Sequence, residues 1–416
     1  MLKKLSVAIV LVLLGSVYAQ TKVVWWDFLG GGDGVRMKSL IDDFNSSHDD
    51  IQIEATTLEW GPSYYTKVQT SAAVGESPDI MTYHVSRFPL GIQGNVLRPI
   101  SEEELASVGL STADYPSNLI DAMTFDGNLY GVPLDIHAII MYFNKDILGP
   151  LGLLGDDGLP NFTDNLENYN AAMQTIKDAG KLPLSVATGN DGTVWRVFYS
   201  MIGQQGASFI EGNEVTVGDA GVKALDTIRN WIEQGYAPEN TDYAASIALF
   251  TSGEAAMHIN GVWEVPTMVD LAAQGELFDW SAVRIPVWFD QPATWADSHA
   301  FAIPNDARNP ISDEKLAAVL EIMSWMNKNS LFWATAGHIP AYTPVVESAD
   351  YQAMEPNATY AVLADNAFFD PASTVTGVAS PAYDAALNLL VPSINGQLPS
   401  DQAIQMLKQE LESQLR

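Results

Sequence analysis

The sequence predicts an α/β protein in which helices pack on the faces of a mostly parallel sheet. Up to residue 85, short apolar runs alternate with stretches whose apolar residues recur at helical spacing, in the order β-α-β-α-β. A hydrophobic fraction of 47% excludes a disordered chain. The length of 416 residues exceeds that of an ordinary single domain and therefore favours two α/β lobes over one.

The N-terminal elements follow from the spacing of apolar residues. An apolar run at 23–26 predicts a strand, which the glycine cluster at 30–34 ends. The next apolar residues lie at i, i+3, i+4 and i+7 and predict one buried face of a helix. These residues are Met37, Leu40, Ile41 and Phe44. The further elements expected here are a strand at 51–55, a helix at 63–74 and a strand at 80–83.

The same alternation returns later in the chain. Apolar strands are expected at 138–143, 255–259 and 300–303. Ser312 is expected to cap a helix that buries Leu316, Val319, Leu320 and Met323, and Ser400 to cap a last helix. Segments 149–165 and 305–310 have the composition of loops.

The first segment predicts export. Lys3 and Lys4 precede an apolar stretch at 5–17 that is too short to span a bilayer, and small residues at 17–19 suit signal peptidase. Residues 1–19 are therefore expected to be a signal peptide; the alternative is an N-terminal membrane anchor. Because the chain contains no cysteine that a lipid could modify, we expect a periplasmic protein without a direct membrane anchor.

Composition disfavours several classes of protein. The 51 acidic against 20 basic residues give a formal charge of −31, so nucleic acid and anionic lipid surfaces are not expected as partners. The absence of cysteine removes disulfides, zinc–thiolate sites, iron–sulfur clusters and thiol nucleophiles. No motif of a zinc protease, a serine hydrolase or a phosphate-binding loop is present, so no catalytic residue is assigned.

Cofactor and metal motifs are equally weak. The cluster at 30–34 lacks the third glycine of a dinucleotide loop, so a tight turn is the simpler interpretation, although a helix N-terminus there could donate N–H groups. The six histidines show no metal-ligand spacing. The acidic stretch at 156–164 lacks the bidentate glutamate of a calcium loop. No cofactor and no metal are therefore expected.

Aromatic residues lie beside polar ones near the ends of predicted elements. They are Trp25, Trp26, Trp60, Tyr64, Tyr65, Tyr83, Trp195, Trp263, Trp295 and Tyr342. A sugar offers C–H faces that pack on aromatic rings and hydroxyls that bind carboxylates, amides and histidines, so both residue types favour a sugar site. The alternative is that most of these rings pack in the core, where Trp is commonly buried.

Several segments together resemble the extracellular solute-binding proteins of carbohydrate ABC transporters, the maltose-binding-protein-like family 1. The resemblance covers essentially the whole chain after the signal peptide, and 250–263 (FTSGEAAMHINGVW) is its most specific part. One departure is Phe143, where the family's Tyr-Asn-Lys strand end has tyrosine. The other segments that carry it are 24–45, 75–80, 130–133, 141–146, 337–341 and 395–411.

The resemblance implies a two-lobed periplasmic-binding-protein fold of type II, with discontinuous lobes joined by hinge crossings. It places one lobe at 20–133 plus 287–335 and the other at 134–286 plus 336–416. It implies a monomer without catalytic activity that captures a mono- or oligosaccharide between the lobes and delivers it to the membrane subunits of an ABC permease. The alternatives are a charged small solute (acidic sugar, polyamine or polyol phosphate) or a secreted glycan-cleaving enzyme.

The resemblance also assigns ligand-binding positions, with Trp263 as the expected stacking platform. His84, His137 and His338 have an alternative role as packing residues, and that role is favoured for His137. The residues expected to contact the ligand are Phe28, Asp33, Tyr65, His84, Asp135, Trp195, Trp263, Asp297, His299 and His338.

Overall fold

The computed structural model describes residues 20–415, so the predicted signal peptide at 1–19 lies outside the described residues. A first sheet has the strand order β2-β1-β3-β15-β4, with β7 paired to β15. β1 is parallel to β2 and β3, whereas β15 is antiparallel to its neighbours. The strands are β1 (Thr21–Asp27), β2 (Ile51–Thr57), β3 (Ile80–His84), β4 (Leu97–Arg98), β7 (Val132–Pro133) and β15 (His299–Pro304).

A second sheet has the order β17-β14-β8-β12-β9, with β13 and β16 also paired to β8. β8 is buried along its whole length and runs antiparallel to every strand that it pairs with here. The expectation of a mostly parallel sheet therefore fails around β8, because periodicity does not reveal strand direction. The strands are β8 (Asp135–Asn144), β9 (Leu182–Ser185), β12 (Ala255–Gly261), β13 (Trp280–Arg284), β14 (Thr294–Asp297), β16 (Ile339–Pro340) and β17 (Ala367–Phe369).

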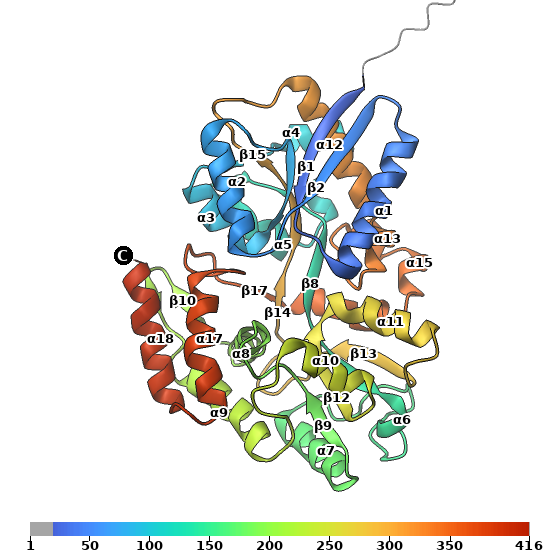
Figure 1. Ribbon diagram of the computed structural model, residues 1–416, viewed down its shortest axis with the longest axis vertical. Helices are drawn as coiled ribbons and strands as arrows, with labels where there is room; N and C mark the ends of the chain where they lie inside the picture. The colour runs from blue at the N-terminus through green and yellow to red at the C-terminus, as the bar shows by residue number, and fades with distance from the viewer. Residues whose placement is uncertain (1–19, 416) are drawn as a thin grey trace, which may run out of the picture.

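Helices cover both sheets (Figure 1). α1 and α12 lie beside β1 and β2 at the top of the view, and α17 and α18 pack against α8 and α9 below. The predicted face of α1 is confirmed, because Met37, Leu40, Ile41 and Phe44 are its buried residues. The longer helices are α1 (Gly31–Ser47), α2 (Pro62–Val74), α7 (Leu166–Asp178), α8 (Thr193–Gln204), α9 (Gly218–Glu233), α10 (Tyr243–Thr251), α11 (Val265–Ala273), α12 (Asp313–Lys328), α17 (Pro381–Ile394) and α18 (Ser400–Gln414).

Short elements fill the connections. Two small hairpins pair β5 (Thr124–Phe125) with β6 (Asn128–Leu129) and β10 (Ile210–Glu211) with β11 (Glu214–Val215). The short α-helices are α3 (Phe88–Gln93), α4 (Glu102–Ser107), α5 (Ser117–Ala122), α6 (Lys145–Leu148), α13 (Ser330–Ala334), α14 (Thr343–Val346), α15 (Ala349–Gln352) and α16 (Asn357–Tyr360). The 3₁₀ turns are η1 (Val85–Arg87), η2 (Thr112–Asp114), η3 (Val262–Glu264) and η4 (Ala361–Asn366). Among residues 20–415, none of the helices combines the length and apolarity needed to cross a bilayer.

The two predicted helix caps have different outcomes. Ser312 caps α12, since its hydroxyl accepts a hydrogen bond from the backbone N–H of Lys315. Ser400 is instead the first residue of α18, with Pro399 at the cap position. Its hydroxyl donates to Asp226 Oδ1 at 2.6 Å, so this side chain joins α18 to α9.

Within residues 20–415 the chain passes between the sheets three times, and two of these crossings are single residues that lie side by side, while the third runs from β15 through α12 and α13 to β16. Leu134 separates β7 of the first sheet from β8 of the second, and Ser298 separates β14 from β15. Leu134 N–H donates to the carbonyl of His299 at 2.8 Å, which joins the two crossings. The lobe limits remain a prediction, but β14 pairs in the second sheet although the range 287–335 grouped it with the first.

Candidate functional site

A cavity of about 780 Å³ lies between elements of the two sheets, a size within the ~300–1,000 Å³ typical of small-molecule sites. The first sheet contributes the turn after β1 and the end of β3, and the second contributes η3, β14 and the start of β8. Helices α8, α10 and α17 complete the wall. The lining residues include Phe28, Asp33, Glu59, Trp60, His84, His137, Asp191, Arg196, Tyr243, Trp263, Trp295, His299, His338, Ala379, Tyr383 and Asp384. We call this cavity the cleft.

Four histidines meet at the cleft from four strand ends. His84 ends β3 and lies opposite His299, which begins β15. His137 lies near the start of β8, and His338 directly precedes β16. The His137 and His299 rings are 4.3 Å apart, and His84 is 5.0 Å from His299. The packing role favoured for His137 stays a prediction, since this ring is 3% exposed and also lines the cleft.

Asp135 organises this group from behind the wall. It is completely buried and accepts hydrogen bonds from His137 Nδ1 (3.0 Å), His299 Nδ1 (2.8 Å) and Trp333 Nε1 (2.8 Å). Burial by itself raises the pKa of Asp135, but the neighbouring His299 and His338 and the hydrogen bonds hold that pKa well below its usual value. Asp135 therefore carries charge and fixes two rings without lining the cleft.

His338 has a different environment. Its ring is fully buried and stacks on Trp333 with ring centroids 4.9 Å apart. Nε2 lies 3.1 Å from Asp33 Oδ1 and Nδ1 lies 3.8 Å from Asp135 Oδ2, yet neither nitrogen makes a hydrogen bond within the described residues. Burial lowers the pKa of His338, but Asp33 and Asp135 outweigh it, so the pKa is raised.

The turn that presents His338 requires glycine. Gly337 has φ +91°, and a Cβ there would lie 1.9 Å from the carbonyl oxygen of Val262. Gly34 plays a similar role at the other side, since a Cβ would lie 2.5 Å from the carbonyl oxygen of Leu29. Gly30 is the N-cap of α1 and residues 31–34 form its first turn, so the glycine cluster is the strand-to-helix turn and places Asp33 in the first turn of that helix.

Aromatic rings and one cation form another part of the wall. The Arg196 guanidinium lies 4.9 Å from the rings of both Trp263 and Trp295. Trp263 Nε1 donates to the Tyr243 hydroxyl at 2.8 Å. Trp263 thus lines the cleft, and its role as a stacking platform stays a prediction. Sequence reasoning did not select Arg196, Tyr243 or Tyr383 as ligand contacts, because only the folded chain brings α8, α10 and α17 to this edge.

Six of the ten predicted residues line the cleft: Phe28, Asp33, His84, Trp263, His299 and His338. The other four, Tyr65, Asp135, Trp195 and Asp297, lie behind it. Tyr65 OH is 2.6 Å from His84 Nδ1, and Asp297 accepts from Ser86 Oγ at 2.5 Å. Trp195 is fully buried and stacks on Tyr199, so it does not reach the cleft surface. The next residue on α8, Arg196, lines the cleft instead.

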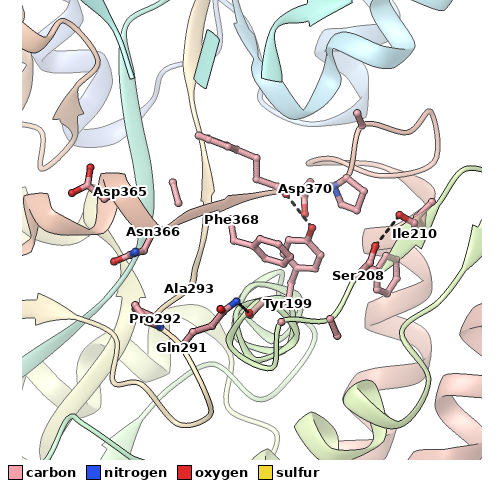
Figure 2. A pocket seen from close by; sticks show the side chains of 18 residues that line it. Tyr199, Ser208, Ile210, Gln291, Pro292, Ala293, Asp365, Asn366, Phe368 and Asp370 are labelled. Carbon is pink, nitrogen blue, oxygen red and sulfur yellow. Dashed lines mark hydrogen bonds between the residues drawn. The ribbon is translucent and has the colours of Figure 1, made fainter. Parts of the chain in front are cut away.

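A second cavity of about 760 Å³ lies beside β17 (Figure 2). Tyr199 and Phe368 stack in its wall with ring centroids 4.5 Å apart, and Gln291, Ser208 and Asp370 also line it. No histidine lines this cavity within residues 20–415. The cleft is therefore the stronger candidate for a specific small-molecule site.

Comparisons with known proteins agree with this architecture. The pattern of the bacterial extracellular solute-binding protein family matches residues 39–360. The sugar-binding protein MalE from Xanthomonas citri superposes with a TM-score of 0.79 at 18% identity, covering 95% of this chain and 97% of that one. Maltose-bound MalE3 of T. maritima gives 0.78 at 17% identity, covering 95% and 100%. These similarities confirm the two-lobed α/β fold expected from the sequence.

Curated relatives are similar in sequence. A maltooligosaccharide ABC transporter solute-binding lipoprotein of Streptococcus pneumoniae is 23% identical over 374 residues, which cover 86% of this chain and 82% of the relative. An arabinooligosaccharide-binding protein of Bacillus subtilis is 22% identical over 283 residues, which cover 65% and 61%. The two relatives are named for different sugars.

Proposed function

Because the chain belongs to the bacterial extracellular solute-binding proteins, we propose that it captures an oligosaccharide in the cleft and delivers it to an ABC permease. The observation that carries the proposal is the composition of the cleft wall. Rings of Phe28, Trp263 and Trp295 lie beside imidazoles and carboxylates, and a sugar needs both kinds of surface. The relatives named for maltooligosaccharides and arabinooligosaccharides support the same class of ligand.

The polar groups suit hydroxyl recognition. Within the described residues, Nε2 of His84, His137 and His299 makes no hydrogen bond to protein, while Nδ1 of each ring is held by Tyr65 or Asp135. The rings therefore have fixed orientations and one free nitrogen each for a sugar hydroxyl. A volume of about 780 Å³ lies in the upper part of the usual range, which favours an oligosaccharide over a monosaccharide.

The family is one of binding proteins and not of enzymes, and the positions of the carboxyl groups are consistent with this. A glycan-cleaving enzyme requires a carboxylic acid with a raised pKa in contact with the glycosidic bond. Burial raises the pKa of Asp297 to about 6 and that of Asp370 to about 7, but neither side chain lines the cleft. These two carboxyl groups are thus not placed to protonate a sugar bound in the cleft.

The compartment and assembly state belong to the same proposal. We expect export through 1–19, action outside the inner membrane as a monomer, and docking of the loaded protein on the permease. Relatives in S. pneumoniae are named lipoproteins. This chain has no cysteine among its 416 residues, which supports a protein without a lipid anchor.

A ligand panel tests the function. Calorimetry and thermal unfolding of residues 20–416 would be measured with malto- and arabinooligosaccharides, monosaccharides, acidic sugars and a polyamine. A ligand at 100 times its dissociation constant stabilises the folded protein by about 2.7 kcal/mol. We expect this for a neutral oligosaccharide that chromatography recovers intact. Stabilisation only by a charged solute would replace the proposed ligand, and cleavage of the oligosaccharide would replace binding by catalysis.

A further inference from the structure

Three histidines and one aspartate form a compact group on the crossing-strand side of the cleft. Asp135, His137, His299 and His338 each offer one ligand atom, and these atoms all lie within 4.8 Å of one another. Their exposed fractions are 0%, 3%, 5% and 0%. We propose that these four side chains bind a divalent transition metal ion, with Zn²⁺ as the best fit. Three of these side chains also line the cleft, so the ion would lie next to the proposed sugar site and bind other nitrogens than those left for sugar hydroxyls.

The distances within the group fit a tetrahedral ion. The Asp135 carboxylate oxygens lie 3.0 Å from His137 Nδ1, 2.8 Å from His299 Nδ1 and 3.8 Å from His338 Nδ1. Zinc bonds nitrogen and oxygen at about 2.0–2.2 Å, so neighbouring ligands of a tetrahedral site are roughly 3.3–3.5 Å apart. The three distances lie on both sides of this value, and all four ligand atoms lie within 4.8 Å of one another, so the side chains would draw closer together around one ion.

His338 supplies a second and independent observation. Both of its ring nitrogens are fully buried without a hydrogen-bond partner in the part of the chain that the structure describes. A buried unpaired polar atom is costly, at about 1–3 kcal/mol. Asp33 Oδ1 lies 3.1 Å from Nε2, whereas the nearest carboxylate oxygen to Nδ1, Asp135 Oδ2, lies 3.8 Å away and is already bonded to His299 and Trp333. A metal ion on Nδ1 gives that nitrogen a partner at bonding distance.

The groups around His338 and Asp135 are of the kind that support metal ligands in other proteins. With Nδ1 on the ion, Nε2 of His338 carries a proton and faces Asp33 Oδ1 at 3.1 Å, which is also without a hydrogen-bond partner. A carboxylate on the far nitrogen is the usual companion of a metal-bound histidine. Trp333 Nε1 holds Asp135 Oδ2 at 2.8 Å in the same supporting role.

The donor set and access select the ion. Three imidazoles with one carboxylate suit Zn²⁺, Co²⁺, Ni²⁺ or Cu²⁺ and do not suit Ca²⁺ or Mg²⁺, which prefer oxygen ligands. His137, His299 and His338 all line the cleft, so an ion can enter from solvent. The group is invisible to a search for spaced motifs, because its members lie at positions 135, 137, 299 and 338.

The experiment is a titration of tag-free residues 20–416, first dialysed against a chelator. Calorimetry with Zn²⁺ and absorption with Co²⁺ should show one ion per chain, with the visible bands of a low-coordinate cobalt site. His338→Gln should lose the bands. Asp33→Asn should weaken the affinity by about 10–100-fold, the usual effect of removing a partner of a ligand. His48→Gln, which changes a histidine outside the cleft, should bind as the wild type.

Each outcome decides the proposal. Failure of the wild-type protein to bind Zn²⁺ or Co²⁺ at one per chain overturns it, as does unchanged binding by a folded His338→Gln variant. If His338→Gln does not fold, the wild-type stoichiometry and the Asp33→Asn affinity decide instead. The sugar panel is repeated on the metal-free protein, so loss of sugar binding and loss of metal binding are separate results.

Discussion

Trp295 donates its indole N–H to Asp370 Oδ1 at 3.3 Å, and this hydrogen bond joins the walls of two cavities. Trp295 lines the cleft, whereas Asp370 lines the cavity beside β17. Trp195 Nε1 donates to the same oxygen at 2.9 Å. Burial, followed by the nearby charge of Asp297, raises the pKa of Asp370 from 3.8 to about 7. The wall between the cavities thus contains a carboxyl group that keeps its proton well above the usual range.

Asp370→Asn should make stability less dependent on pH. The folded protein holds the Asp370 proton up to about pH 7, whereas the unfolded chain releases it near 3.8. The folded state therefore binds more protons between these values, and stability falls as pH rises through this window, by at most about 1.4 kcal/mol per unit. Asparagine keeps an acceptor for both indoles and cannot ionise. Urea unfolding near pH 5 and near pH 8 gives the change in the free energy of unfolding between the two pH values. An equal change in the wild type and in Asp370→Asn would contradict the prediction.

Trp263→Ala should weaken oligosaccharide binding while the protein stays folded. The ring lines the cleft next to Arg196 and Trp295, where the proposed sugar would meet an aromatic face. Removing such a face costs about 1 kcal/mol or more, which corresponds to a loss of roughly fivefold to tenfold in affinity. Phe332→Ala, an exposed aromatic away from the cleft, is the matched control. Unchanged calorimetric affinity would remove Trp263 from the ligand contacts.

Gly337→Ala should destabilise the fold by about 2 kcal/mol or more, because the methyl group would enter the carbonyl oxygen of Val262 at a left-handed backbone position. Gly396→Ala is the control, since Gly396 has a similar positive φ of 74° but no atom within 4 Å of an added Cβ. That variant should lose only about 1 kcal/mol. Chemical denaturation compares the two, and equal losses would mean that backbone strain alone limits position 337.

Tyr65→Phe should cost about 1–2 kcal/mol of stability and reduce ligand affinity, because His84 Nδ1 then loses its partner at 2.6 Å and the ring loses its fixed orientation. Tyr115→Phe is a close control, since the Tyr115 hydroxyl is buried without a partner within residues 20–415. Its removal should be neutral or slightly stabilising. An equal loss of affinity in both variants would show that the His84 contact does not matter for binding.

Much of the fold could be predicted from the sequence, because the spacing of apolar residues indicates which side of a helix or strand is buried. The apolar face of α1 and the strands around residues 80, 140, 257 and 301 follow from periods of 3.6 and 2 or from continuous apolar runs. Strand direction around β8 and the sheet to which β14 belongs did not follow, since both depend on pairing between segments distant in sequence.

The cleft was predictable only in part. Residues at strand ends, such as Phe28, His84 and Trp263, could be placed because strand ends gather at one edge. Arg196 and Trp195 are neighbours on α8, and the sequence alone does not say which of them faces the cleft. The grouping of His137 and His338 around Asp135 required two chain crossings and the turn at Gly337, which no local pattern encodes.

The single-residue crossings at Leu134 and Ser298 have a mechanical consequence. A rotation of one sheet relative to the other would pivot at the crossings, and points close to a rotation axis move least. Asp135 and His299 directly follow these two crossings. Whenever the sheets change their relative orientation, the histidines on this side of the cleft should keep nearly the same positions relative to one another. Exposed lining residues such as Trp60 should be displaced farther by the same rotation. In the proposed function, the histidines would then determine which chemical groups are accepted, and the exposed lining residues would determine how long a ligand the cleft accommodates.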